Sequence, residues 1–150
     1  MVVRLRALSP DDYPYVVERV DEWWGGRPVA AMLPRLFFDH FPRTSFAAVD
    51  VGQDRLVGFL CGFVSQRDPA EAYIHFVGVD PSCRSEGVGR RLYETFFARA
   101  SALGCRTVGC VTSPVNTGSI EFHHRMGFRS KVVAGYDGRG GDRVVFERAL

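Results

Sequence analysis

The segment Arg84-Ser85-Glu86-Gly87-Val88-Gly89 has residue types and spacing suited to binding a diphosphate. It follows an apolar run and opens an amphipathic one, so it predicts a strand, a glycine-bearing loop and the first turn of a helix. At such a junction several backbone N–H groups and the positive end of a helix dipole point at one place, which attracts anions. Gly87 and Gly89 allow a phosphate to approach the backbone closely, and the Arg84 guanidinium matches phosphate oxygens. A tight turn without a ligand is the alternative for the two glycines.

Other phosphate-binding motifs do not fit this loop. A nucleoside-triphosphate loop needs G-x-x-x-x-G-K-[ST], which the sequence lacks. A dinucleotide fingerprint needs a third glycine and an early β-α-β unit, and neither accompanies Gly87-Val88-Gly89. What remains is R-x-x-G-x-G at the start of a helix, directly after a strand that ends in Val77-Gly78-Val79-Asp80-Pro81. The diphosphate therefore belongs to a different class of ligand.

Hydrophobic spacing and turn residues predict the elements that position this loop. Ser9-Pro10-Asp11-Asp12 begins the first helix with a capping residue, a proline and acidic residues, and Gly25-Gly26 ends it. Pro34 kinks or divides the second helix. The predicted strands cover residues 2–8, 45–50, 56–66, 71–79, 106–112, 128–135 and 143–149, and the helices cover 9–24, 29–40, 88–103 and 116–126. This order predicts an α/β fold with a mixed central sheet whose N-terminal half is mostly antiparallel.

The composition predicts one globular domain over residues 1–150. Hydrophobic residues make up 46% of the chain, and the net charge of +2 is too balanced to favour nucleic acid or an anionic membrane as a partner. The longest apolar stretch, Leu56 to Val64, is too short to span a bilayer. Because the N-terminus lacks a signal-peptide pattern, we expect a cytoplasmic protein. The cysteines show no C-x-x-C spacing, so we expect reduced thiols and no metal site.

The loop and its surroundings resemble the GNAT superfamily of N-acetyltransferases. Phe76 to Pro81 followed by the R-x-x-G-x-G loop is similar to the family's acetyl-CoA motif, and the helix continues with Leu92 as the family's does. Asn116 opens the next helix, like the family's Asn at that place. That helix ends in His123-His124-Arg125-Met126-Gly127-Phe128, similar to the family's F-Y-x-x-x-G-F pattern. Because the element order also matches, the resemblance implies a GNAT-like fold, with strands splayed at the acetyl-CoA site and helices flanking the sheet.

The resemblance implies an N-acetyltransferase that moves an acetyl group from acetyl-CoA to a primary amine of a small molecule or peptide, by direct attack in a ternary complex. Acetyl-CoA is then the co-substrate, and no metal is implied. The residues implied to bind acetyl-CoA are Val77, Val79, Arg84, Ser85, Glu86, Gly87, Val88, Gly89 and Asn116. Among them, the Val77 and Val79 backbones would bond the pantetheine amides, and the Val77 N–H would polarise the thioester carbonyl.

The reaction also requires two proton transfers. The family's proton donor to the departing thiolate is usually a Tyr four residues before the Gly of the G-F pair. Here that residue is His123, which can donate a proton near neutral pH. The family's base is often a carboxylate on the strand before the loop, but the matching residue is Tyr73. His75 points to the same face of an ideal strand and is the candidate base, through water. A hydrogen-bonded core histidine is the alternative for His75.

In the family, the loop between the first two helices lines the acceptor site. Trp23-Trp24-Gly25-Gly26 would then form an aromatic wall with a mobile hinge, so we expect Trp23, Trp24 and Tyr73 to contact the substrate. The alternative is a core tryptophan followed by a helix stop. A homodimer is possible, as is common in the family. Because the family's Tyr and strand carboxylate are both missing, a non-catalytic acyl-CoA-binding or sensor module is the alternative function.

Overall fold

The loop singled out above follows β4 (Glu71–Val79), a strand of a seven-stranded mixed sheet in the computed structural model, which describes residues 1–150. The strands are hydrogen-bonded in the order β1-β2-β3-β4-β5-β7-β6. The others are β1 (Val3–Ala7), β2 (Phe46–Asp50), β3 (Arg55–Val64), β5 (Thr107–Thr112), β6 (Arg129–Val133) and β7 (Arg143–Ala149). β4 and β7 have the bounds that the sequence predicts, and the other strands differ by one or two residues at most ends.

Strand pairing confirms the predicted mixed sheet. β2 pairs antiparallel with both β1 and β3, and β7 pairs antiparallel with both β5 and β6. β4 and β5 pair in parallel, through Glu71–Tyr73 against Thr107–Gly109. The separation of β4 from β5 beyond these residues stays a prediction.

The helices begin and end near the residues that the sequence marks. They are α1 (Tyr13–Trp23), α2 (Leu36–His40), α3 (Val88–Ala102) and α4 (Thr117–Arg125). Before α1, the short 3₁₀ turn η1 (Pro10–Asp12) carries a capping box, in which Ser9 and Asp12 satisfy each other's backbone N–H groups. The predicted helix over residues 29–40 is divided, because Pro34 separates the 3₁₀ turn η2 (Ala30–Met32) from α2.

The residues group into two compact units, a first unit of residues 1–63 and 74–99 and a second unit of residues 64–73 and 100–150. In the first unit, neighbouring residues of β3 face different helices. A Cβ on Gly58 would lie 2.9 Å from Val88 Cγ1 of α3, whereas the Phe59 ring packs 6.3 Å from Phe38 and 6.4 Å from Trp23. Since successive side chains of a strand point to opposite faces, α3 covers one face and the α1–α2 layer covers the other.

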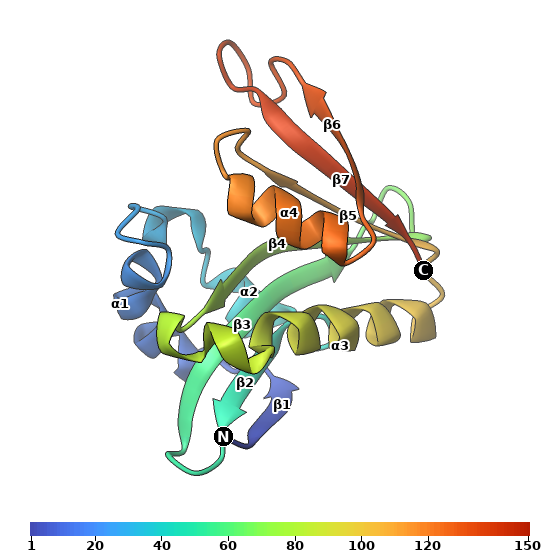
Figure 1. Ribbon diagram of the computed structural model, residues 1–150. Coiled ribbons are helices and arrows are strands. Elements are labelled where there is room, and N and C mark those ends of the chain that lie inside the picture. The colour runs from blue at the N-terminus through green and yellow to red at the C-terminus, as the bar shows by residue number, and fades with distance from the viewer. The chain divides into compact units, whose positions relative to one another are not determined.

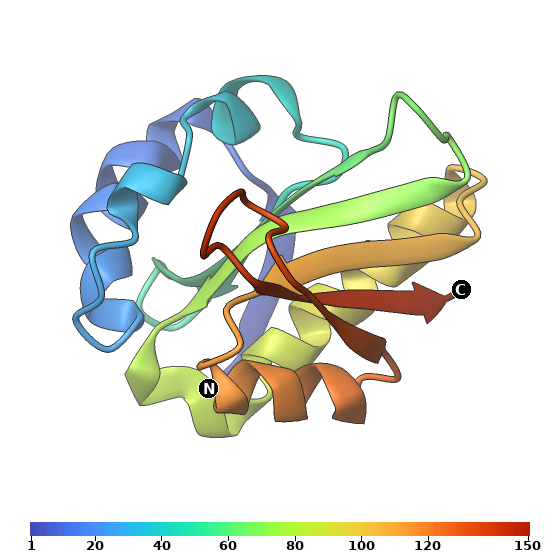
Figure 2. The same ribbon diagram turned by 90° about the horizontal axis from the view of Figure 1, so that it is seen from above.

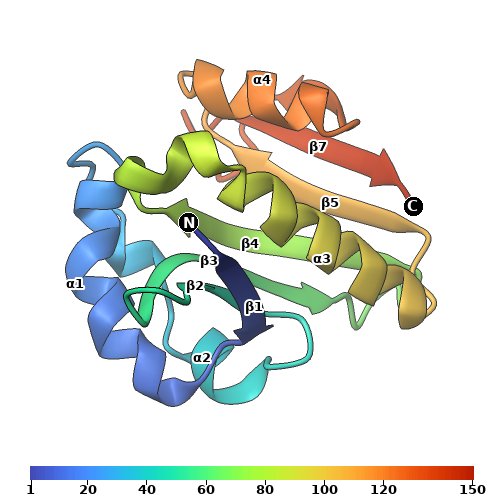
Figure 3. The same ribbon diagram turned by 60° about the horizontal axis from the view of Figure 1, so that its bottom comes forward.

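Two views of the first unit show this arrangement. The ribbons of α1 and α2 lie on one side of the strands of this unit in Figure 2. The Tyr13 ring of α1 packs edge-on against the Phe38 ring of α2, with ring centroids 5.1 Å apart. α3 lies in front of the strands of this unit in Figure 3. The core between β3 and the α1–α2 layer includes the fully buried Val16, Val20 and Phe59. None of the helices is of a length and apolarity that would let it cross a membrane.

In the second unit, α4 packs against β7 through aromatic rings. The His123 ring stacks on Phe146 at 4.3 Å, and Phe128 meets both rings edge-on. Phe128 follows Gly127, which has a φ of +90°. The Gly-Phe pair therefore ends α4 with a left-handed turn and returns an aromatic ring to the core.

Candidate active site

Figure 1 shows β4 leading through the 3₁₀ turn η3 (Pro81–Glu86) into α3. Asp80 fixes the start of this turn: its carboxylate accepts from the Ser82 N–H at 2.9 Å and from Arg55 of β3 at 2.7 Å. Burial raises the pKa of Asp80, but the hydrogen bonds from Arg55 and Ser82 outweigh it, so the net pKa is lowered. The ionised carboxylate therefore holds the loop to β3.

Gly87 joins η3 to α3 in a left-handed conformation, with φ of +72° and ψ of 21°. A Cβ there would meet no atom within 4 Å, so the space beside this residue is open. The next residue, Val88, is fully buried and anchors the helix through its side chain. The first turn of a helix has backbone N–H groups without intrahelical partners, and glycine supplies no side chain to cap them. The open, positive helix end fits a diphosphate.

Arg84 makes a contact that the sequence did not predict. Its guanidinium donates a short hydrogen bond to the Trp23 carbonyl at the end of α1. Ser85 and Glu86 of the same turn are exposed. The Arg84 guanidinium is thus bonded within the protein, and its phosphate contact stays a prediction.

Val77 on β4 is also joined to α1. Its carbonyl accepts a hydrogen bond of 3.0 Å from the Trp24 indole Nε1–H. The Trp24 ring lies 4.8 Å from Phe76, which stacks on Phe59 at 5.9 Å. Gly78 must be glycine here, because a Cβ would lie 2.5 Å from the Phe59 ring. Three aromatic rings thus fix the backbone from Phe76 to Gly78, which includes the predicted cofactor residue Val77.

The two tryptophans of the predicted aromatic wall have different environments. Trp23 is 3% exposed and packs in the core. The alternative of a core tryptophan describes it, and we propose no substrate contact for it. Trp24 is only half-buried. The following glycines, Gly25 and Gly26, have φ of +70° and +85° and end α1 as predicted.

His75, the candidate base, has a defined tautomer. Its Nε2 lies 2.9 Å from the Met32 carbonyl oxygen, which can only accept, so Nε2 carries the hydrogen. In the neutral ring the lone pair is therefore on Nδ1. Phe37 stacks parallel on the imidazole, with ring centroids 4.9 Å apart. The side chain is half-buried, so both the core and the catalytic interpretations of His75 find support.

Tyr73, the other predicted substrate residue on β4, belongs to the second unit. Its phenol is hydrogen-bonded to Tyr136, and its pKa is raised by burial and then by the neighbouring Tyr136 and Cys110. A phenol with a raised pKa stays protonated at neutral pH, so Tyr73 offers a hydrogen-bond donor and not a base.

Asn116 caps α4 in the second unit. Its Oδ1 accepts from the Ser119 N–H at 3.3 Å, and its Nδ2 donates to Thr112 Oγ1 at 3.4 Å. Asn116 thus opens this helix as predicted, and its contact with the cofactor stays a prediction.

His123 is buried at 6% exposure. Its Nδ1 lies 2.7 Å from the Ser119 carbonyl oxygen, so Nδ1 carries the hydrogen and Nε2 is the basic nitrogen of the neutral ring. Burial lowers its pKa, the Ser119 hydrogen bond opposes this, and His124 lowers it further. His123 is therefore neutral at pH 7, and acting as a proton donor requires it to take up a proton first.

We expect His123→Phe to flatten the acid side of the stability curve. The folded pKa lies below the value of 6.5 for an unperturbed histidine, so the unfolded chain binds this proton first as the pH falls. The contribution of His123 to the free energy of unfolding is therefore complete above pH 6.5 and declines as the pH falls below that value. Urea unfolding at pH 7 and pH 5 should show a smaller difference in the variant than in the wild type, and an unchanged difference would contradict the buried neutral ring. His40→Gln, at an exposed residue, serves as the control.

Sequence reasoning missed three partners of the candidate residues: Met32, Phe37 as a stacking partner, and Tyr136. The Met32 contact uses a backbone carbonyl, which no residue type signals. Phe37 is a buried aromatic of α2 that contacts His75, and Tyr136 lies in the loop between β6 and β7. Two acidic residues of α1 and α2 have structural partners: Asp21 accepts from the Val29 and Ala30 N–H groups, and Asp39 pairs with Arg35.

The cysteines are interior residues of the protein. All four are unpaired and buried. Burial raises the pKa of the Cys61 and Cys110 thiols, which therefore stay protonated. No group of three or more His, Cys, Asp and Glu side chains is arranged to hold a metal ion.

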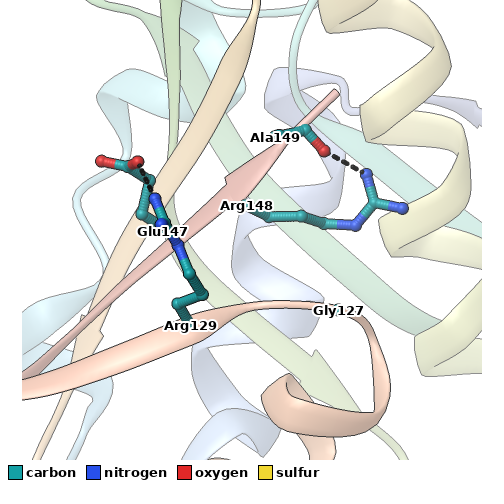
Figure 4. A pocket seen from close by; sticks show the side chains of 5 residues that line it. All are labelled: Gly127, Arg129, Glu147, Arg148 and Ala149. Carbon is teal, nitrogen blue, oxygen red and sulfur yellow. Dashed lines mark hydrogen bonds and ion pairs between the residues drawn. The ribbon is translucent and has the colours of Figure 1, made fainter.

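A surface pocket of about 440 Å³ lies in the second unit, lined by Gly127, Arg129, Glu147, Arg148 and Ala149 (Figure 4). Its charged groups are engaged by one another and by the backbone: Arg129 pairs with Glu147 at 2.8 Å, and Arg148 Nε donates to the Met126 carbonyl at 2.8 Å. A Cβ on Gly127 would lie 3.2 Å from Arg148 Nε. The glycine of the Gly-Phe pair therefore also makes room for the arginine that caps α4.

Comparisons with known proteins concern the family and the fold. The Acetyltransferase (GNAT) family matches residues 4–128. A mycothiol acetyltransferase from Gordonia bronchialis is 30% identical over 106 residues, which are 70% of this chain and 33% of that protein. An uncharacterized N-acetyltransferase from Methanocaldococcus jannaschii is 38% identical over 81 residues, which are 51% of this chain and 36% of that protein. This chain thus spans about a third of the length of these curated relatives.

Solved structures share the fold. Ard1 from Thermoplasma volcanium has a TM-score of 0.81 at 22% identity, covering 100% of this chain and 99% of that chain. Diaminobutyrate acetyltransferase EctA from Paenibacillus lautus, in complex with its diamine substrate and coenzyme A, has a TM-score of 0.75 at 22% identity, covering 99% of this chain and 95% of that chain. At these identities the likeness concerns the fold alone.

Proposed function

This chain belongs to the GNAT acetyltransferase family, and from that premise we propose that it transfers the acetyl group of acetyl-CoA to a primary amine by direct attack in a ternary complex. The observation that carries the proposal is the open N-terminus of α3, where Gly87 leaves a clear approach to the first backbone N–H groups. A diphosphate bound there places the pantetheine arm along β4.

The backbone of the first unit does the binding and the polarising. The amides from Arg84 to Gly89 hold the diphosphate, and the Val77 and Val79 backbones hold the pantetheine. Acetyl-CoA supplies an activated acetyl thioester. The Val77 N–H donates to the thioester carbonyl and stabilises the negative charge that develops on it, a contribution that is strongest where the donor is already fixed in place. The packing of Phe76 and Gly78 against Phe59 provides that rigidity.

Proton movement falls to the two histidines. His75 Nδ1 accepts a proton from the acceptor ammonium, directly or through one water, and the neutral amine that this leaves attacks the thioester, while Nε2–H stays on the Met32 carbonyl. His123, once protonated at Nε2, donates to the departing thiolate. Because the pKa of His123 is lowered, its protonated form is scarce at neutral pH. The alternative proton donor to the thiolate is the acceptor amine or a water molecule.

The acceptor is a primary amine of a small molecule or a peptide. Proteins of this fold include a diaminobutyrate acetyltransferase bound to its substrate and a NatC complex bound to a peptide and CoA, which supports both classes. Within this chain, Trp24 and Tyr73 remain the proposed substrate contacts. The hydrogen bond of Tyr73 with Tyr136 brings the β6–β7 loop to the same side chain.

Acetyl-CoA should raise the melting temperature through mass action, and a panel of primary amines should release free CoA thiol above background. No shift at millimolar acetyl-CoA would contradict the binding proposal. A thermal shift without turnover on any amine would favour the non-catalytic sensor. That alternative is motivated by the absence of the family's tyrosine proton donor and strand carboxylate. His123→Phe should keep the thermal shift, because no cofactor contact is assigned to that ring.

A further inference from the structure

Residues 24–33, which join α1 to α2 and are called here the α1–α2 segment, are tied to β4 at both ends. Trp24 donates to the Val77 carbonyl at 3.0 Å, and the Met32 carbonyl accepts from His75 at 2.9 Å. A further side chain, Tyr13, holds the segment to α1 through a hydrogen bond of 3.1 Å to the Leu33 carbonyl. The ties to β4 thus involve a candidate cofactor residue and the candidate base.

The position of the Trp24 indole bears on the cofactor. In an extended strand, the N–H and C=O groups of one residue point to the same edge, as the paired bonds of antiparallel ladders show. An indole bonded to the Val77 carbonyl therefore lies at the edge toward which the Val77 N–H also points. The proposed function gives that edge to the pantetheine arm and the thioester.

The indole can leave this edge without disturbing the rest of the segment. Trp24 lies just beyond α1 and is half-buried. It is followed by Gly25 and Gly26, and a Cβ built on either glycine would meet no atom within 4 Å. Past the glycines, Asp21 holds the Val29 and Ala30 N–H groups at 2.8 and 2.7 Å. These bonds keep η2 in place when the Trp24 side chain rotates.

We propose that the Trp24 indole N–H competes with the pantetheine of acetyl-CoA for the Val77 carbonyl, so that Trp24 is a gate on the cofactor-binding edge of β4. This inference rests on the proposed function. The gate opens when acetyl-CoA binds. The indole then leaves β4 and stays with the α1–α2 segment, whose Met32 carbonyl is bonded to His75. Cofactor binding is thereby coupled to the side chain proposed to contact the acceptor.

Isothermal titration calorimetry with acetyl-CoA tests the competition, because the gate predicts that Trp24→Phe lowers the Kd for acetyl-CoA and a supporting role predicts that it raises it. Trp24→Phe keeps a ring against Phe76 but removes the N–H donor, so the gate predicts a Kd about three- to tenfold lower than that of the wild type, the size of one modest hydrogen bond. Tyr13→Phe is the matched control: it also removes one hydrogen bond to the segment, but away from β4, and should leave the Kd unchanged.

An unchanged or raised Kd in Trp24→Phe would overturn the gate, since a group that merely supports the strand would weaken binding when removed. If the wild type itself bound no acetyl-CoA, the proposed function would fall, and the competition with it. A second measurement uses only the wild-type protein, so it does not depend on whether a variant folds. With ¹⁵N-labelled tryptophan in the wild type, saturating acetyl-CoA should speed solvent exchange of one indole N–H and leave the buried Trp23 unaffected; protection of both would contradict the gate.

Discussion

Gly87→Glu is expected to reduce the affinity for acetyl-CoA by at least about 100-fold, or about 2.7 kcal/mol. The new carboxylate would lie beside the first turn of α3, where the space next to Gly87 is open, and would occupy the helix end meant for a diphosphate. Two like charges then compete for one set of N–H donors. Calorimetry with acetyl-CoA measures the loss, and the activity on any amine should fall with it.

Backbone strain must be separated from the blocked site, because Gly87 has a φ of +72° that side chains rarely adopt. Gly104→Glu is the matched control: Gly104 has a φ of +90°, is exposed, and also has no neighbour within 4 Å of a Cβ position. It should lose comparable stability and keep wild-type affinity. Wild-type affinity in Gly87→Glu would show that the diphosphate does not bind at this helix end.

His75→Gln is expected to lower kcat by about 10²- to 10³-fold, the usual contribution of a general base. The glutamine amide can still donate to the Met32 carbonyl, as His75 Nε2–H does, but it has no basic nitrogen in place of Nδ1. The Kd for acetyl-CoA and the melting temperature should change little. Steady-state kinetics measure kcat, and calorimetry and thermal unfolding measure the Kd and the melting temperature.

The control is His40→Gln, at an exposed histidine of α2, which should keep the full rate. If His75→Gln retained kcat within twofold of the wild type, the imidazole would be a core histidine held by Phe37 and Met32, and the acceptor would lose its proton to water or to another group. A loss of kcat that came with a large loss of stability would also point to a structural role.

The order and type of the elements could be predicted because each has a local signal. Ser9 and Pro10 start the first helix, and Pro34 divides the second. β4 has the bounds of the strand predicted over residues 71–79. The R-x-x-G-x-G loop is read from the same kind of local evidence, since φ at Gly87 and the burial of Val88 follow from a strand-to-helix junction. The 3₁₀ form of residues 81–86 was not predicted, because its single cap, Asp80, is fixed by a distant arginine of β3.

The partners of the candidate side chains could not be predicted, because they depend on contacts between residues far apart in the sequence. Arg84 bonds a carbonyl of α1, and Trp24 bonds a carbonyl of β4. Neither carbonyl is marked by its residue type. The same holds for His123, whose residue type alone suggests an acid near pH 7, while burial keeps the ring neutral against the opposing hydrogen bond to the Ser119 carbonyl.

A crystal structure of the protein grown with excess coenzyme A measures the central claim most directly. The diphosphate should lie against the backbone N–H groups from Arg84 to Gly89, with the pantetheine along Val77 and Val79. Density for coenzyme A at another place, or none at this helix end under saturating conditions, would contradict the assignment of this chain as an acetyl-CoA-dependent enzyme.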